Sequence, residues 1–85
     1  MSEDAIQRAM EVKRRHEKQL MRKLNVVAVG VGLRQRGGAP TREVCIVVSV
    51  KKKLHPSQLR PVDRIPPSIE GVPIDVVETG EIRAL

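Results

Sequence analysis

The sequence contains no phenylalanine, tyrosine or tryptophan, a single cysteine and two histidines. Without aromatic rings, the chain lacks the platforms on which many proteins stack the bases of single-stranded nucleic acids. Cys45 has no partner for an intrachain disulfide, and His16 and His55 stand alone, without metal-ligand spacing. We therefore expect neither a disulfide nor a bound metal ion.

Long apolar runs are also missing, and the N-terminus begins with the acidic stretch MSEDAIQRAM. A membrane-spanning helix needs about 20 mostly apolar residues, and a signal peptide needs a basic start followed by an apolar segment. These absences predict neither a membrane span nor a signal peptide. Together with the lone cysteine, they lead us to expect a cytoplasmic protein that does not bind membranes.

Aliphatic residues are abundant, with thirteen valines, six isoleucines and six leucines among 85 residues. A chain of this length is predicted to form one small domain over residues 1–85, near the lower limit for folding without cross-links. Small branched side chains bury less area than aromatic rings. We therefore expect modest stability for a monomer, which favours a homo-oligomer that completes the core.

The pattern predicts an α+β fold, with an N-terminal helix packed on a small three-stranded sheet. Along the chain, we expect a helix region at 1–24, a β-hairpin at 25–51, a proline-rich connection with a short helical turn at 52–71, an edge strand at 72–79 and a tail at 80–85. The last strand is placed at an edge because Pro73 cannot donate a hydrogen bond to a neighbouring strand.

The helix is predicted over residues 3–23, with Ser2 as its N-terminal cap and acidic residues in its first turn. Its apolar stripe is predicted to contain Ile6, Met10, Leu20 and Leu24, at spacings close to a multiple of 3.6 residues. Charged residues interrupt this stripe in the middle. The first half of the helix is therefore expected to project from the body or to pack on another copy.

The two hairpin strands are predicted at 25–33 and 43–51, joined by the longer connection RQRGGAPTR. Gly30-Val31-Gly32 begins like a dinucleotide-binding motif, but Gln35 occupies the position of the third glycine and no helix follows. We therefore expect no cofactor. The two glycines are instead predicted to thin one face of the strand, so that another backbone, such as the N-terminal helix, can approach closely.

No combination of residues points to catalysis. His55 precedes Pro56 in a loop and lies near Ser57, but no spacing forces a nucleophile, a base and a carboxylate together. Cys45 lies at the centre of a predicted strand and is expected to be an inert core residue. We predict that the chain is not an enzyme.

The net charge of +6 comes from two basic clusters and from the helix. The first cluster flanks the hairpin tip, and the second leaves the second strand at its other end, so the two do not form an obvious single patch. The candidate partner-binding residues are these clusters and the glycines of the first strand: Arg34, Arg36, Arg42, Lys51, Lys52, Lys53, Gly30 and Gly32. Sequence-nonspecific contacts with nucleic-acid phosphates are the second interpretation of the same charges.

Residues 24–83 carry a run of motifs in a recognisable order: VVAVGVG, a threonine after the hairpin turn, an apolar strand ending in KKK, and IPPSIEGVPIDVVE. In this order they resemble the segment that precedes the protease domain in bacterial and narrow-leaf-type trypsin-like peptidase proteins. The resemblance implies an accessory role, either docking to a protease-like domain or assembling copies. It implies no catalytic residue in this chain, because the catalytic residues of those proteins lie downstream of the segment.

The sequence thus predicts a non-catalytic interaction or self-assembly module, acting by edge-strand pairing and helix packing. Its expected partner is another copy of the chain or a protease-like domain. Nucleic-acid binding through the basic clusters is the alternative.

Overall fold

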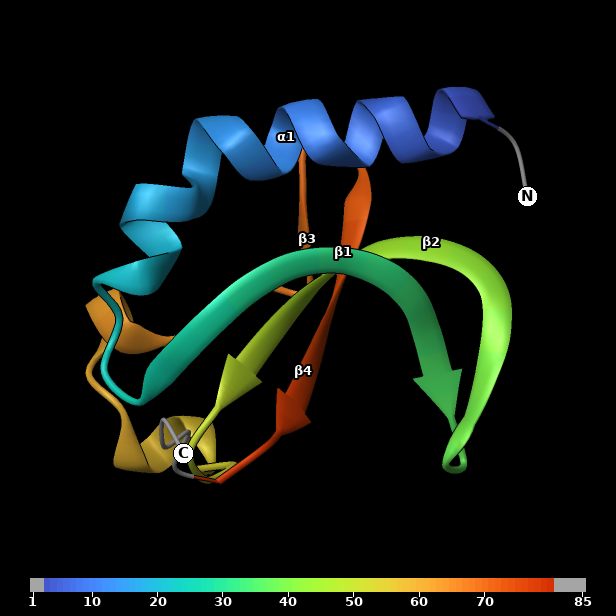
Figure 1. The fold of residues 1–85 in the computed structure, drawn as a ribbon. Coiled ribbons are helices and arrows are strands. Elements are labelled where there is room, and N and C mark those ends of the chain that lie inside the picture. Colours follow the sequence, from blue (N-terminus) through green and yellow to red (C-terminus); the bar gives the residue numbers. More distant parts are fainter. Residues whose placement is uncertain (1–2, 81–85) are drawn as a thin grey trace, which may run out of the picture.

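The computed structural model of the protein describes residues 3–80, which form one α-helix against a four-stranded sheet (Figure 1). The elements follow the order α1 (Glu3–Met21), β1 (Val26–Arg36), β2 (Ala39–Val50), the 3₁₀ helices η1 (Pro56–Gln58) and η2 (Pro61–Asp63), β3 (Ser68–Ile69) and β4 (Val72–Glu78). The predicted α+β class is confirmed, although the sheet has four strands instead of three. The predicted cap Ser2 and most of the predicted tail lie outside the described residues. Within those residues, no helix is long and apolar enough to cross a membrane.

The additional strand is β3, which forms a tight hairpin with β4. Glu70 and Gly71 connect the two strands with positive φ angles of 49° and 80°. Two successive residues with positive φ are typical of a type I′ turn, whose twist matches that of the strands it joins. A strand of two residues shows no alternation, so the sequence pattern did not reveal it.

The strand order is β1-β2-β4-β3, so β4 has β3 beside its first residues and forms an edge of the sheet along the rest of its length. The predicted edge position therefore holds only for the part of β4 that follows Pro73. β4 pairs in parallel with β2 from Ile74 onward, and β3 pairs only with the beginning of β4, at Val72 and Pro73. Pro73 is tolerated there because it precedes the pairing with β2. Beyond Ile74, β4 has no strand on its outer side among the described residues.

The β1–β2 hairpin is longer than predicted, and its turn is shorter. Only Gly37 and Gly38 lie between the strands, with φ angles of 59° and 81°. Gln35 pairs with Pro40, so most of the predicted connection is strand. The two glycines supply the positive φ angles of a two-residue turn, which other residues adopt only with strain.

The face of the helix that packs on the sheet overlaps only in part with the predicted stripe. Met10 and Leu24 are 54% and 60% exposed, whereas Leu20 is 1% exposed. The buried residues of α1 are Ala9, Val12 and Leu20. Small side chains at the first two positions suit a close approach to the sheet, and this requirement outweighed the larger side chains of the predicted stripe.

The core lies between α1 and the sheet face that carries the hydrophobic side chains of β2 and β4. Its buried members are Ala9, Val12, Leu20, Ile46, Val48, Val50, Val72 and Ile74. All are aliphatic, as the composition requires.

Gly30 and Gly32 lie on the opposite sheet face, so the predicted approach of the helix to these glycines is wrong. The neighbouring residues Val29 and Val31 pack against the core that α1 covers. The β1–β2 hairpin curves away from the helix towards its tip (Figure 1). Because Val29 and Val31 face the core under the helix, the alternating glycines face the inner side of this arch. A methyl group on Gly32 would lie 3.2 Å from Val47 Cγ2, whereas one on Gly30 would meet nothing within 4 Å.

A hydrogen bond across the inner side holds the arched hairpin against β4. The backbone N–H of Gln35 donates to Asp75 Oδ2 over 3.0 Å. Cys45 lies on this side of β2 and is fully buried. Burial also raises the pKa of its thiol, which keeps the thiol protonated and unreactive.

A charged cluster fastens the β3–β4 turn to α1. Arg15 donates two hydrogen bonds to the Glu70 carboxylate, of 3.1 and 2.9 Å, and His16 Nε2 donates a third of 2.8 Å. Arg8 donates to the Glu70 carbonyl oxygen over 2.7 Å. The bonds from Arg15 and then His16 lower the pKa of Glu70 from 4.5 to about 2, so this carboxylate stays charged under mildly acidic conditions.

Candidate partner-binding site

The basic residues at the hairpin tip differ in their surroundings. Arg34 forms a salt bridge with Glu43, with 3.0 Å between Nη1 and Oε1. Arg36 and Arg42 are exposed, whereas Gly30 and Gly32 are half-buried in the arch. Two arginines are therefore the exposed cations that the tip offers to a partner.

The three lysines at the other end of β2 expose their side chains, while their backbones are fixed. Lys51 N donates to Asn25 O over 3.0 Å, and Lys53 N donates to Glu78 Oε1 over 2.7 Å. The Asn25 side chain bonds to both the N–H and the carbonyl oxygen of Lys52. Asn25 itself adopts a φ of 76°, which asparagine tolerates better than most residues.

The two basic clusters do not merge into one cationic surface. The curved hairpin brings Gly37, Gly38 and Lys53 to the rim of one open hollow, which Asp75 and Glu78 also line. Neither Arg36 nor Arg42 lines it. The carboxylates disfavour a phosphate in this hollow, because like charges repel.

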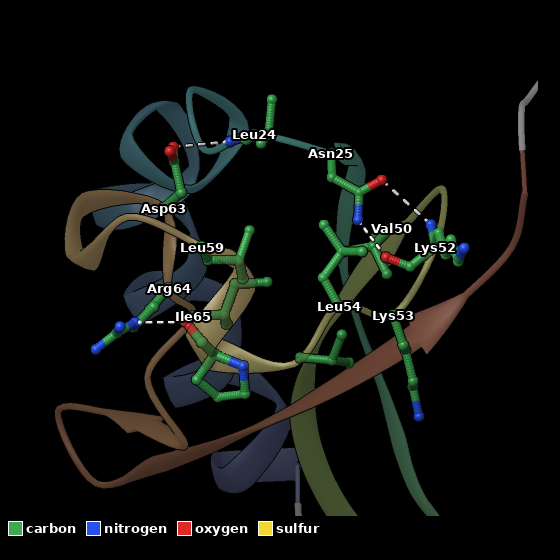
Figure 2. A pocket seen from close by; sticks show the side chains of 12 residues that line it. Leu24, Asn25, Val50, Lys52, Lys53, Leu54, Leu59, Asp63, Arg64 and Ile65 are labelled. Atoms are coloured by element: carbon green, nitrogen blue, oxygen red, sulfur yellow. Dashed lines mark hydrogen bonds between the residues drawn. The ribbon is translucent and has the colours of Figure 1, made fainter.

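A different feature, absent from the predicted site, is a pocket of about 440 Å³ beside the C-terminal ends of β2 and β4 (Figure 2). Its aliphatic lining comes from the α1–β1 turn, both strands and the proline-rich segment: Leu24, Val50, Leu54, Leu59, Ile65 and Val76. Pockets of this size and character are typical of binding sites.

Hydrogen bonds between distant segments hold the pocket walls in place. Leu24 N donates to Asp63 Oδ1 over 3.0 Å, which joins the α1–β1 turn to η2. Arg64 Nε donates to Pro56 O over 3.0 Å, which joins η2 back to η1. With the Asn25 bonds to Lys52, these contacts lie around the border of the pocket, as Figure 2 shows.

The buried carboxylate of Asp63 is the central support of this wall. It accepts hydrogen bonds from Leu24 N and from Arg60 Nε, and these bonds hold its pKa below the ordinary value. The side chain is only 6% exposed. Because both carboxylate oxygens already accept hydrogen bonds from the protein, Asp63 supports the wall instead of presenting its charge to a ligand.

Each short helix in the pocket wall begins at a proline, which has the backbone angle required in a first turn. The single helical turn predicted at Pro56 is confirmed, and η2 is an additional one. His55 caps η1: its Nδ1 accepts from Ser57 N over 3.2 Å and lies 2.8 Å from Ser57 Oγ. Among the described residues, no carboxylate bonds to the other ring nitrogen of His55.

Sequence reasoning missed the pocket because its residues are scattered over four segments. The available signal was the recurrence of Leu54, Leu59, Val62 and Ile65 in a segment whose prolines prevent a long helix. Aliphatic side chains in such a segment have to pack on another part of the protein or remain exposed. The structure does both, since Ile65 packs against the core and Val62 is 66% exposed.

Comparison with known protein families identifies a match over nearly the whole fold. The family model described as the NARROW LEAF 1 N-terminal domain matches residues 4–79. The chain belongs to this family. The match runs from the first turn of α1 to the end of β4, so the NARROW LEAF 1 N-terminal domain includes both the sheet and the pocket wall. No curated protein matches the chain.

Proposed function

We propose that this NARROW LEAF 1 N-terminal domain is a non-catalytic docking module that binds a protein partner through the pocket beside Leu24. The observation that carries the proposal is an aliphatic pocket of about 440 Å³ whose walls are held by hydrogen bonds. A preformed pocket of this kind binds with little loss of conformational entropy.

The exposed apolar side chains around the pocket support the same proposal. Leu24 is 60% exposed at the rim, and Val62 is 66% exposed on the neighbouring segment. Lys23 Nζ donates to Val62 O over 2.7 Å, which keeps the two segments together. Covering Leu24 with a partner would remove apolar surface from water, which is worth about 1.5–3 kcal/mol for a fully buried leucine side chain.

The partner we propose is a trypsin-like peptidase domain. This choice rests on the resemblance of residues 24–83 to the segment that precedes such domains. The alternative partner is a second copy of the chain, which could add a strand beside the outer side of β4 after Ile74.

Nuclear magnetic resonance can test this proposal with the isotope-labelled chain and an added peptidase domain from a narrow-leaf-type protein. We expect chemical-shift changes to concentrate at Leu24, Leu59 and Ile65, and Leu24→Ala to weaken binding about tenfold or more. Met10→Ala is the matched control, because Met10 is similarly exposed but lies on α1 outside the pocket. Spectra that stay unchanged at a millimolar concentration of the added peptidase domain would refute docking. A dimer in light scattering that Leu24→Ala abolishes would assign the pocket to a second copy.

A further inference from the structure

The rim of the pocket is cationic, in contrast to its aliphatic floor. Lys52, Lys53 and Arg64 contribute to the lining. The only acidic residue in that lining, Asp63, is buried and bonded to the protein. Glu78 lies close by, but its Oε1 accepts a hydrogen bond from the backbone of Lys53. The charge available to a ligand at the rim is therefore positive.

The floor of the pocket favours an apolar group of the ligand. Its side chains are leucine, isoleucine and valine, and no buried side-chain nitrogen or oxygen in residues 3–80 lacks a hydrogen-bond partner. An aliphatic side chain entering the pocket would thus leave no polar side-chain group of the protein without a partner. A nucleic-acid base would find no aromatic ring on which to stack.

We propose that the pocket binds an acidic peptide segment, which inserts one aliphatic side chain between Leu24 and Leu59 and places its flanking carboxylates against Lys52, Lys53 and Arg64. This inference deepens the proposed docking function and rests on it, because it specifies the chemistry of the partner segment. The aliphatic anchor supplies affinity through burial, while the carboxylates select the partner by charge complementarity.

Fluorescence anisotropy with a labelled peptide tests the proposal directly. The probe has a central leucine flanked on both sides by aspartate and glutamate, and the measurement is made at about 0.15 M salt, where long-range attraction is screened. We expect saturable binding that is lost when alanine replaces the central leucine or lysine replaces the acidic residues. Equal binding of the leucine and alanine peptides would overturn the proposal, because it would show attraction by charge alone.

A pair of charge-reversal variants locates the binding. Lys52→Glu with Lys53→Glu changes the rim, while Arg36→Glu with Arg42→Glu makes the same change in net charge at the hairpin tip. All four side chains are exposed, and the hydrogen bonds of the lysines use backbone atoms. We expect the rim variant to weaken binding about tenfold or more and the tip variant to change it about twofold or less. Equal weakening by both variants would overturn the assignment to the pocket.

The same variants separate this inference from the docking function. If the peptidase domain shifts the pocket resonances and the rim variant binds that domain normally, docking stands and the acidic segment is refuted. If the acidic peptide binds at the pocket and the domain does not, the peptidase partner is refuted and the inference stands. Thermal melting of each variant, followed by circular dichroism, verifies that binding is compared between folded proteins.

Discussion

Leu20 and Leu24 offer a sharp test of how α1 and the following turn are placed. They lie about one helical turn apart in the sequence, yet Leu20 is 1% exposed in the core and Leu24 is 60% exposed at the pocket rim. Leu20→Ala leaves a cavity between the helix and the sheet, and such substitutions cost about 2–5 kcal/mol. Leu24→Ala removes the same atoms from a largely exposed position, where the expected change is within about 0.5 kcal/mol.

The loss of stability expected for Leu20→Ala is large relative to the total free energy of unfolding. Domains are stable by about 0.05–0.15 kcal/mol per residue, which gives about 4–13 kcal/mol for 85 residues. In a domain of this size, each kcal/mol shifts the Tm by about 4–8 °C. We therefore expect Leu20→Ala to lower the Tm by about 10 °C or more, and Leu24→Ala to leave it nearly unchanged.

Far-ultraviolet circular dichroism is the appropriate probe, because the chain has no tryptophan or tyrosine to report unfolding by fluorescence. Urea titration then gives the free energy of unfolding, and an unchanged slope shows that the substitution altered stability and not compactness. Equal losses in the two variants would refute the helix placement described above. A large loss in Leu24→Ala that grows with protein concentration would instead show that Leu24 is buried between copies.

The glycines, the Glu70 cluster and the thiol give three more predictions. Gly30→Ala should stabilise the protein by about 0.4–1 kcal/mol in urea titrations, whereas Gly32→Ala should be the less stable of the two because its methyl group meets a side chain at 3.2 Å. As pH falls from 4.5 to 2, Tm should fall more in the wild type than in Glu70→Gln, because the unfolded carboxyl group takes up a proton before the folded one. Cys45 should react with a thiol reagent only after unfolding, because it is fully buried and burial raises its pKa.

For each of these three predictions, a specific result would contradict the structural explanation. For the pH series, Glu11→Gln removes one exposed helix carboxylate, and identical pH profiles for the two glutamine variants would contradict the role of Glu70. For the glycines, a Gly32→Ala variant more stable than Gly30→Ala would contradict the tight packing inside the arch. Rapid labelling of Cys45 in the native protein would show that the arched hairpin opens.

The candidate site divides into a part that the sequence anticipated and a part that it did not. Lys52 and Lys53 were predicted from their exposed charge, and the structure places both at the rim of the pocket. The aliphatic floor was not predicted, because Leu24 and Leu59 lie far apart in the chain and line one pocket only after folding. Hydrogen bonds of Asp63 and Asn25 then hold the segments around that pocket. No periodicity within one segment encodes such a contact.

By itself, the sequence determined the α+β class, the location of the helix and the two glycines of the hairpin turn. These follow from interactions within one segment: helix-forming residues with acidic residues at the start, alternation in the strands, and the positive φ angles that Gly37 and Gly38 adopt at little cost. The same local logic predicted that Cys45 would be buried.

Only the tertiary structure decided which helix face is buried, where β4 lies in the sheet and which face of β1 lies on the inner side of the curved hairpin. Met10 and Ala9 are neighbours on the helix, and only Ala9 is buried against the sheet. Which of the two is buried depends on how closely the helix and the sheet approach each other. Likewise, β4 pairs in parallel with β2, and the β3–β4 turn is hydrogen-bonded to α1 through Glu70 and Arg15. These outcomes depend on the fit between segments that are distant in the sequence, and that fit exists only once the chain has folded.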